Sequence, residues 1–504
     1  MYWLKDLHVL VLGLGDSGLA MARWCARHGA QVTVWDSRES PPHAEALARE
    51  LPTARFARDL PSASVFQLVL KSPGLAPDDA RVAPVLTEAA DTGIAVLGEL
   101  GLFARALADL KQVQSYAPQV LAITGTNGKT TTTAMTALLV ERAGRSVAMA
   151  GNVGPTMLDT LTARLDDLPQ VWVLELSSFQ LDGVHRFEPS AAVVLNITQD
   201  HLDWHGTMPA YAAAKARVYG GDGVMVINRN DAAVVALEPQ PIPGESKGRG
   251  KAKPTPVTRA IVRFGLDAPQ RPGDFGLVTE NGMAWLVRAL PVDETVKRRR
   301  GEGEEIHLQL LMPADALRVR GRHNAANALA ALALATAIGC ALAPMLHGLR
   351  EYEGQAHRVQ FIASVGGIEA YDDSKGTNVG ATVAALNGLG ADKAPAKLVL
   401  ILGGDGKGQD FSPLREPLAR HARAVATIGR DAVALEAVLG PVPFQRHATL
   451  QAAVAWCFEQ AQPGDAVLLS PACASLDMFR NYAHRAEVFV QAVRSLAHER
   501  GAVT

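Results

Sequence analysis

A Gly-Lys-Thr element near residue 125 contains residue types that bind nucleotide phosphates. Residues 120–133 read Val-Leu-Ala-Ile-Thr-Gly-Thr-Asn-Gly-Lys-Thr-Thr-Thr-Thr. The apolar start predicts a buried strand, and the end predicts a helix that continues through Leu139. Backbone N–H groups of such a loop bind phosphate oxygens, Lys129 reaches the β/γ-phosphates, and the Thr130 hydroxyl ligates Mg²⁺. We therefore expect a phosphate site at Gly125, Thr126, Asn127, Gly128, Lys129, Thr130 and Thr131.

Three further apolar stretches of this region end in polar side chains. The stretch 146–150 leads to Asn152, 170–174 leads to Glu175, Ser177 and Gln180, and 191–195 leads to a segment that contains His201. Because the carboxyl ends of parallel strands meet at one edge of a sheet, these groups are expected near the phosphate loop. Glu175 together with phosphate oxygens suits Mg²⁺. Lys215 lies in an expected helix over 207–219, and the sequence alone predicts a solvated lysine there.

The last third of the chain repeats the order strand, polar loop, helix. Expected strands at 368–371, 397–402 and 466–469 precede the polar loops 372–378, 403–407 and 470–477. This order is typical of a doubly wound domain with a site at its strand ends. Lys375 and Lys407 make that site cationic, which suits an anionic small molecule. Cys473 has no local histidine partner and is expected to pack in the core.

A Gly-x-Gly-x-x-Gly element follows the first expected strand. Strand 8–12, Gly13–Gly18, a helix to about His28 and a second strand ending at Asp36 match the dinucleotide fingerprint. Read literally, this pattern indicates NAD, although any Rossmann-like domain that binds a pyrophosphate can have it. A strand over 65–70 leads to Ser72 and Gly74, which join the candidate site.

Length and composition indicate a globular protein of several domains. The chain has 504 residues, 48% hydrophobic and 20% charged, with a net charge of −2. This balance predicts about three domains and no general affinity for nucleic acid or anionic membranes. Four scattered cysteines favour the reducing cytoplasm over a disulfide framework. The nearly uncharged stretch 325–345 is expected to be one buried helix and not a membrane span.

The expected architecture is α/β throughout, with three domains. We expect a Rossmann-like domain over 1–106, a P-loop domain with a mostly parallel sheet over 107–352, and a doubly wound domain over 353–504. Short strands are expected at 260–264, 276–278, 284–287 and 306–311. Two segments, 239–256 and 294–305, have the composition of flexible surface insertions.

Seven segments together resemble the Mur ligase family, and the resemblance extends over nearly the whole chain. They are 125–131 (GTNGKTT), 175–181 (ELSSFQL), 196–203 (NITQDHLD), 321–324 (GRHN), 357–358 (HR), 373–378 (DSKGTN) and 470–477 (SPACASLD). The P-loop variant and the Asp-His element are shared by Mur and folylpolyglutamate ligases. The Ser-Phe-Gln element and the last loop point to members that add D-glutamate. The resemblance also accounts for the short spacing between Gly125 and Gly128.

The resemblance implies a reaction in peptidoglycan precursor synthesis. ATP would phosphorylate the terminal carboxylate of UDP-N-acetylmuramoyl-L-alanine, and the amine of D-glutamate would attack the acyl phosphate, with release of ADP and phosphate. The implied catalytic residues are Lys129, Glu175, His201 and Lys215. Two Mg²⁺ ions are implied, with Thr130 and Glu175 on one, His201 on the second, and Lys215 as a ligand if it is carbamylated. We expect a cytoplasmic monomer with small-molecule partners, no nucleic acid and no membrane insertion.

The resemblance also implies three groups of binding residues. For ATP they are the phosphate loop with Asn324, Arg358 and Asp373. For the UDP-linked substrate they are Asp16, Ser17, Asp36, Arg38, Ser72, Gly74, Asn152, Ser177, Gln180 and His201. For D-glutamate they are Lys375, Thr377, Lys407, Ser475, Leu476 and Tyr482, where Tyr482 replaces an expected phenylalanine.

Three other functions compete with this interpretation. A different amino-acid ligase of the same architecture differs mainly in the Ser-Phe-Gln and Ser-Pro-Ala-Cys elements. An NAD-dependent dehydrogenase rests on Gly13–Gly18 and Asp36 alone and leaves the phosphate loop unexplained. A nucleotide-switched binding protein needs no second anion site. Release of ADP that depends on an amino acid separates the ligases from the other two.

Overall fold

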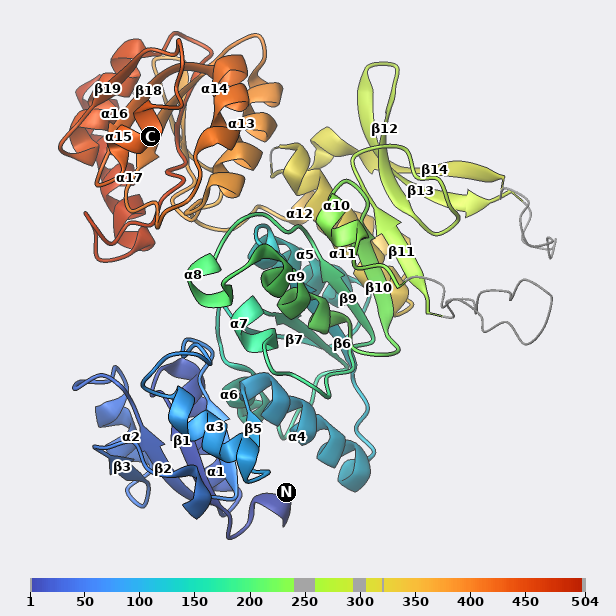
Figure 1. The fold of residues 1–504 in the computed structure, drawn as a ribbon. Coiled ribbons are helices and arrows are strands. Elements are labelled where there is room, and N and C mark those ends of the chain that lie inside the picture. Colours follow the sequence, from blue (N-terminus) through green and yellow to red (C-terminus); the bar gives the residue numbers. More distant parts are fainter. Residues whose placement is uncertain (1, 240–258, 293–304, 320, 501–504) are drawn as a thin grey trace, which may run out of the picture.

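Three α/β units follow one another along the molecule, with the first at the bottom of Figure 1 and the third at the upper left. The structure is a computed structural model, and it describes residues 2–239, 259–292, 305–319 and 321–500. The expected insertions at 239–256 and 294–305 lie outside these residues, apart from Pro239 and Glu305. The predicted three-domain α/β architecture is confirmed.

The first unit contains a parallel sheet of five strands in the order β3-β2-β1-β4-β5. The strands are β1 (His8–Leu12), β2 (Gln31–Trp35), β3 (Arg55–Ala57), β4 (Leu68–Lys71) and β5 (Ala95–Leu97). The helices are α1 (Asp16–Arg27), α2 (Ala44–Glu50) and α3 (Ala83–Asp91). Alternate residues of β1 enter two different apolar clusters, which explains why its sequence is apolar without interruption. Helix α4 (Glu99–Gln114) then crosses the expected boundary at 106/107 as one continuous helix.

The second unit is built on a parallel sheet of six strands in the order β11-β10-β9-β6-β8-β7. The strands are β6 (Gln119–Thr124), β7 (Val147–Gly151), β8 (Val171–Glu175), β9 (Ala191–Val194), β10 (Val224–Asn228) and β11 (Ile261–Phe264). The helices are α5 (Lys129–Arg142), α6 (Met157–Ala163), α7 (Ser178–Leu181), α8 (Leu202–His205), α9 (Met208–Ala216) and α10 (Ala232–Val235). Strand β6 is central, so the loop after it lies between the ends of β8 and β9.

A small antiparallel sheet extends from the second unit (Figure 1). It contains β12 (Phe275–Glu280), β13 (Met283–Pro291) and β14 (Ile306–Pro313), in that order. Each overlaps a strand predicted from the sequence.

The alanine-rich stretch 325–345 forms two helices, so the prediction of one helix is wrong. Helix α11 (Arg322–Ala337) and helix α12 (Leu342–Glu351) are separated by a turn at Gly339, whose φ is +82°. Glycine adopts this left-handed conformation without steric cost, which ends α11. Helix α11 is buried against α5, which confirms the prediction that this stretch is buried. Among the described residues, no helix is both long and apolar enough to span a membrane.

The third unit has a sheet of six strands in the order β15-β16-β20-β17-β18-β19. The strands are β15 (Gln360–Val365), β16 (Ile368–Asp372), β17 (Leu398–Gly403), β18 (Ala422–Ile428), β19 (Phe444–Arg446) and β20 (Ala466–Leu469). Only the pair β15–β16 is antiparallel among these described strands. The helices are α13 (Val379–Lys393), α14 (Arg415–His421), α15 (Ala432–Glu436), α16 (Leu450–Gln460) and α17 (Tyr482–Glu499). Cys473 is fully buried in this unit, as expected.

Candidate functional site

The loop between β6 and α5 has the conformation of a phosphate-binding turn. Strand β6 ends at Thr124 and α5 begins at Lys129, as the sequence predicts. Gly125 and Gly128 have φ values of +155° and +82°. A Cβ atom on Gly125 would lie 2.9 Å from Leu195 Cβ, and one on Gly128 would lie 2.6 Å from Asn327 Oδ1. Both positions therefore require glycine because of the backbone conformation and because of the close neighbours.

The side chain of Lys129 forms hydrogen bonds to the backbone of the same loop. Its Nζ donates hydrogen bonds of 2.9 Å to the carbonyl oxygens of Gly125 and Thr126. Burial lowers the pKa of Lys129, an effect that nearby Glu175 opposes. The side chain of Asn196, at the end of β9, holds the same loop by accepting from Asn127 N at 2.8 Å and donating to Asn127 O at 3.0 Å. Asn196 was not predicted as a site residue, although its place after an apolar strand was a usable signal.

Glu175 presents a buried carboxylate oxygen toward the phosphate loop region. The residue is 3% exposed, and Oε1 accepts a hydrogen bond of 3.1 Å from Asn152 Nδ2. Oε2 is buried and has no hydrogen-bond partner. Buried carboxylate oxygens are normally paired, so this atom fits a cation such as Mg²⁺. In the described part of the chain, no group of three or more His, Cys, Asp or Glu side chains could hold a metal.

Lys215 is buried, which contradicts the prediction of a solvated helix lysine. The residue is 1% exposed, and Nζ donates a hydrogen bond of 2.9 Å to Gly125 O. The ammonium lies 4.5 Å from the centre of the Tyr211 ring. Burial and the charge of Lys129 lower the pKa of Lys215 well below its usual value. The amine is therefore held close to the phosphate loop in an environment that favours its neutral form.

His201 lies beside the same region, at the start of α8. Its φ is +54°, and its ring packs edge-on against Phe179 with 4.7 Å between the ring centres. Nε2 is 3.6 Å from Asp200 Oδ2. Burial lowers the pKa of His201, although Asp200 opposes this effect. The neutral ring is the form that ligates a metal.

Residues of the third unit contact the phosphate loop directly. Arg358 Nη2 donates to Thr130 Oγ1 at 2.6 Å. The side-chain amides of Asn127 and Asn378 donate to each other, at 3.2 and 3.1 Å. Asn378 was not singled out from the sequence as a site residue, yet it also donates to Asp200 Oδ2 at 3.2 Å.

A narrow cavity of about 70 Å³ lies between the second and third units. Asn324, Arg358 and Asp373, three of the residues predicted for ATP, line it together with Lys375. Asp373 is buried and accepts a hydrogen bond of 2.7 Å from Ser470 Oγ. Burial raises the pKa of Asp373 to about 7, although this hydrogen bond opposes the shift. Further lining residues that were not predicted include His323 and Asn327.

The residues predicted for an amino acid are divided between the three loops that follow β16, β17 and β20 and the start of α17. Lys375 Nζ lies 5.4 Å from the centre of the Tyr482 ring, and burial lowers its pKa to about 8. Ser475 is buried, whereas Leu476 is 71% exposed. Lys407 is exposed and Thr377 is partly buried. Of this group, only Lys375 lines the 70 Å³ cavity.

Arg485 connects the loops that carry Lys375 and Ser475. It is fully buried in α17 and donates to Ser374 O at 2.8 Å and to Cys473 O at 3.1 Å. Burial lowers the pKa of Arg485 to about 10. An arginine within a helical pattern gives no sign of this role, so the sequence could not identify it.

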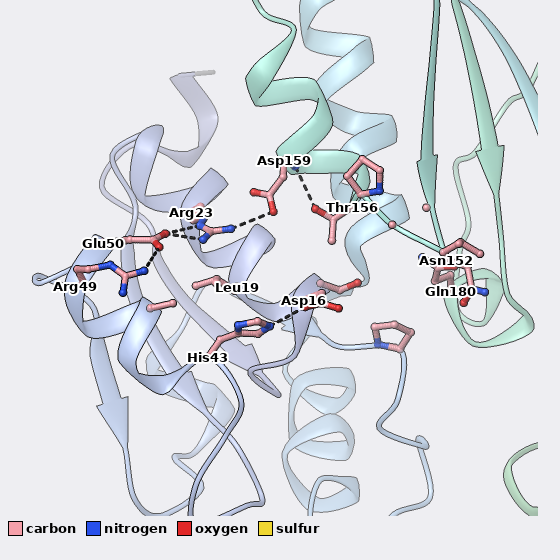
Figure 2. A pocket seen from close by; sticks show the side chains of 17 residues that line it. Asp16, Leu19, Arg23, His43, Arg49, Glu50, Asn152, Thr156, Asp159 and Gln180 are labelled. Atoms are coloured by element: carbon pink, nitrogen blue, oxygen red, sulfur yellow. Dashed lines mark hydrogen bonds and ion pairs between the residues drawn. The ribbon is translucent and has the colours of Figure 1, made fainter. Parts of the chain in front are cut away.

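A larger cavity of about 480 Å³ separates the first and second units (Figure 2). Asp16, at the start of α1, faces Asn152 and Gln180 of the second unit across it, and Ser17 also lines the cavity. These are four of the residues predicted for the UDP-linked substrate. The cavity also contains charged residues that were not predicted, namely Arg23, His43, Arg49, Glu50 and Asp159. They are already paired, because Arg23 contacts Glu50 and Asp159, Arg49 contacts Glu50, and His43 contacts Asp16.

Six predicted substrate residues do not line this cavity, namely Asp36, Arg38, Ser72, Gly74, Ser177 and His201. Asp36 accepts hydrogen bonds from Leu14 N at 2.6 Å and from the backbone and side chain of Arg38. Burial of Asp36 raises its pKa, but these hydrogen bonds dominate and lower the pKa to about 2. Ser72 Oγ donates to Gly13 O at 2.9 Å. In this structure Asp36 and Ser72 therefore stabilise the glycine-rich turn.

Ser177 and Gln180 form a capping box at the start of α7. Ser177 Oγ accepts from Gln180 N, and Gln180 Oε1 accepts from Ser177 N. This pattern satisfies backbone donors at the start of the helix.

Comparison with known proteins finds a family match in three regions of the chain. Residues 7–98 match the Mur ligase MurD-like N-terminal domain, residues 123–243 match the Mur ligase middle domain, and residues 357–473 match the Mur ligase glutamate ligase domain. A protein of Albidiferax ferrireducens named UDP-N-acetylmuramoylalanine–D-glutamate ligase is 61% identical, over 99% of this chain and 98% of that protein. Proteins with the same name from Burkholderia pseudomallei and Polaromonas sp. are 57% and 50% identical, over 98% and 100% of both chains.

Solved structures share the fold at low sequence identity. MurF ligase from Thermotoga maritima in complex with ADP has a TM-score of 0.59 at 15% identity, covering 99% of both chains. The UDP-N-acetylmuramate-alanine ligase MurC from Thermotoga maritima has a TM-score of 0.53 at 19% identity, covering 97% of this chain and 100% of that one. At this identity the likeness concerns the fold alone.

Proposed function

This chain belongs to the Mur ligase family, and we propose that it joins D-glutamate to UDP-N-acetylmuramoyl-L-alanine with ATP. The observation that carries the proposal is the 61% identity, over 99% of the chain, to a protein named for this reaction. The products are the amide, ADP and phosphate. The reaction serves the synthesis of a cell-wall precursor, and therefore cell shape and division.

The reaction proceeds by activation of the substrate carboxylate. The γ-phosphoryl group of ATP passes to this carboxylate, and the amine of D-glutamate then displaces phosphate from the acyl phosphate. Catalysis of such a transfer consists mainly of positioning and of charge stabilisation. Lys129 contacts the loop at Gly125 O and Arg358 contacts Thr130 Oγ1, and these contacts support a role of both residues in binding the γ-phosphate.

Mg²⁺ would be held by the Thr130 hydroxyl and by Glu175, with His201 beside a second ion. The unpartnered Glu175 Oε2 supports this assignment. Bound Mg²⁺ would neutralise charge on the phosphates. Lys215 contributes if CO₂ adds to its neutral amine, and the lowered pKa of this buried lysine supports that chemistry.

Each unit has one ligand in this proposal. The first unit, over 1–106, binds the UDP moiety in the 480 Å³ cavity, which Asp16, Ser17 and Asn152 line. The second unit, over 107–352, binds ATP with help from Asn324, Arg358 and Asp373. The third unit, over 353–504, binds the carboxylates of D-glutamate through Lys375, Lys407 and Ser475, near Thr377, Leu476 and Tyr482. The protein acts as a monomer in the cytoplasm.

The dehydrogenase alternative loses its main support in the structure. It required the Asp36 carboxylate to bind ribose hydroxyls of NAD. Asp36 instead accepts hydrogen bonds from Leu14 and Arg38.

The test is ADP release with UDP-N-acetylmuramoyl-L-alanine and one amino acid at a time. D-glutamate, L-glutamate, L-lysine and meso-diaminopimelate are compared. Turnover with D-glutamate alone is expected. Turnover with another amino acid would retain the ligase chemistry and contradict the assigned amino acid. ATP binding without turnover on any of the four would favour a nucleotide-switched binding protein.

A further inference from the structure

Glu99 is a buried carboxylate that the proposed reaction does not use. It is 2% exposed and is the first residue of α4, where the chain passes from the first unit to the second. It also lines a second cavity of about 390 Å³ between these units. Among the described residues, no cation forms an ion pair with it. An unpaired buried carboxylate is costly, so its hydrogen bonds need an explanation.

Glu99 joins the first turns of two other helices. Ser17 Oγ of α1 donates to Glu99 Oε2 at 2.7 Å, and Leu158 N of α6 donates to Oε1 at 3.1 Å. Burial raises the pKa of Glu99 above its usual value, although these bonds and the Met157 N–H oppose the shift. The carboxylate thus receives donors from both sides of the boundary between the units.

The bond from Ser17 has a consequence for the 480 Å³ cavity, which Ser17 also lines. A hydroxyl group has one proton, and this proton is directed at Glu99. Ser17 therefore offers only lone pairs to a ligand in the cavity. The diphosphate of a UDP-sugar has no proton at neutral pH and needs hydrogen-bond donors. The arrangement with ionised Glu99 does not suit such a ligand.

We propose that Glu99 takes up one proton from solvent when the diphosphate of the UDP-linked substrate binds beside Ser17. The carboxylic acid then donates to Ser17 Oγ, and the Ser17 hydroxyl turns its own proton to a phosphate oxygen. Leu158 N continues to donate to the other carboxyl oxygen. No covalent bond of the substrate changes. The inference rests on the proposed function only for the identity of the ligand.

The surrounding charges favour this proton uptake. Asp159 on α6 raises the pKa of Glu99, and a bound diphosphate adds further negative charge. Asp16 and Arg23 on α1 are paired, with His43 and with Glu50 and Asp159 respectively. The second cavity contributes Lys71, Asp182, His185 and Arg217, of which Arg217 is paired with Asp182. Lys71 Nζ donates to Leu75 O at 2.7 Å and lies over the Trp204 ring, and is not bonded to Glu99.

Calorimetric titration with UDP-N-acetylmuramoyl-L-alanine, without ATP, tests the proposal. The binding heat is measured between pH 6 and 9 in buffers with different ionisation enthalpies, which gives the number of protons taken up. The expected result is an uptake that approaches one proton within this range. Because the complex holds the extra proton, the Kd rises with pH, by up to about tenfold per pH unit. Binding without proton uptake at any pH would overturn the inference and leave the proposed function intact, whereas absence of binding would overturn both.

Two variants assign the proton to its site. Glu99→Gln places an amide donor on Ser17 Oγ, imitating the protonated acid, and is expected to bind the substrate with no proton uptake and a Kd independent of pH. His43→Gln removes a second titratable group that lines the same cavity and is expected to retain the uptake. Loss of the uptake in His43→Gln would contradict the assignment to Glu99. If Glu99→Gln does not fold, the proton count of the unaltered protein and of His43→Gln still decides the question.

Discussion

Arg358 of the third unit donates a hydrogen bond of 2.6 Å to the hydroxyl of Thr130 in the first turn of α5. The two residues are 228 positions apart in the chain, so the contact exists only because the second and third units are closed on each other. Thr130 is also the hydroxyl expected to ligate Mg²⁺. Binding of ATP with Mg²⁺ therefore requires Arg358 to exchange Thr130 for another partner, and a phosphate oxygen is the partner that suits a guanidinium.

Replacement of Arg358 tests this exchange. Arg358→Ala is expected to lower kcat/KM for ATP by about a hundredfold, the effect of losing one preorganised donor to a transferring group. Arg358→Lys should recover part of the loss, because lysine retains the charge without the bidentate geometry. Steady-state kinetics with varied ATP measures both effects.

Arg350→Ala is the matched control. Arg350 lies near the end of α12 and is exposed. This variant should retain the original kcat/KM. Similar losses in Arg350→Ala and Arg358→Ala would contradict a specific role of Arg358.

The amide pair between Asn127 and Asn378 predicts an effect on closure of the second and third units. Asn378→Asp loses the two hydrogen bonds that Asn378 Nδ2 donates and brings a carboxylate next to Asp200. Each lost hydrogen bond costs about 1 kcal/mol, so we expect kcat/KM to fall by at least about tenfold. Small-angle scattering should show a larger radius of gyration than for the unaltered protein.

Asn387→Asp is the control, because it adds the same charge at an exposed position of α13, the helix that Asn378 precedes. It should change neither the radius of gyration nor kcat/KM. Unchanged scattering in Asn378→Asp would show that the amide pair does not maintain the closed arrangement.

The raised pKa of Asp373 predicts a pH dependence of ATP binding. With a pKa of about 7, Asp373 gains a proton as the pH falls below neutrality, and its carboxyl group can then accept fewer hydrogen bonds from the ATP that we propose binds beside it. The KM for ATP should therefore rise below pH 7, by up to about tenfold per pH unit. Asp373→Asn should remove this dependence. Ser470→Ala should move it to higher pH, because the Ser470 hydroxyl lowers the pKa.

The raised pKa of Asp373 also determines how this residue makes the free energy of unfolding depend on pH. In the unfolded chain an aspartic acid has a pKa of about 3.9. Between pH 3.9 and about 7 the folded protein holds a proton on Asp373 that the unfolded chain has lost. The contribution of Asp373 to the free energy of unfolding therefore decreases as the pH rises through this window. A flat profile of the KM for ATP against pH in the unaltered protein would contradict the proposed role of Asp373 in ATP binding.

Burial of Lys215 predicts that its amine reacts with CO₂. Protein prepared with ¹³C-labelled bicarbonate should show a carbamate carbonyl resonance, and Lys215→Arg should lack it because the guanidinium remains charged. Lys215→Arg should also lower activity by at least about a hundredfold, because loss of even an outer partner of a metal site costs up to about this much and the Lys215 carbamate would be a ligand itself. Lys111→Arg alters an exposed lysine of α4 and should retain both signal and activity. A resonance that persists in Lys215→Arg would assign the carbamate to another residue.

Structural features that depend on residues close together in the chain could be predicted from the sequence. The phosphate loop was recognisable because an apolar strand, two glycines and Lys129 follow one another within a short stretch of the sequence. Strand ends such as Glu175 and Asp373 could be assigned to a site because parallel strands align their carboxyl ends. The break of the alanine-rich helix at Gly339 was also accessible, since glycine in a helical pattern is a stop signal.

Features that depend on packing between distant elements could not be predicted. The spacing of residues 207–219 gives no sign that Lys215 points at Gly125 O. Glu99 and Arg485 look like ordinary helix residues, yet each joins segments that are far apart in the chain. Asp36 has the sequence spacing of a residue that binds ribose, but in the structure its carboxylate accepts hydrogen bonds from Leu14 N and Arg38 Nε.

The central claim, activation of the substrate carboxylate by ATP, has a direct isotopic test. UDP-N-acetylmuramoyl-L-alanine labelled with ¹⁸O in its terminal carboxylate is incubated with ATP, Mg²⁺ and D-glutamate, and the released phosphate is analysed by mass spectrometry. An acyl phosphate transfers one carboxylate oxygen to phosphate, so each phosphate formed with the amide should contain one ¹⁸O atom. Unlabelled phosphate, formed together with the amide, would contradict the account.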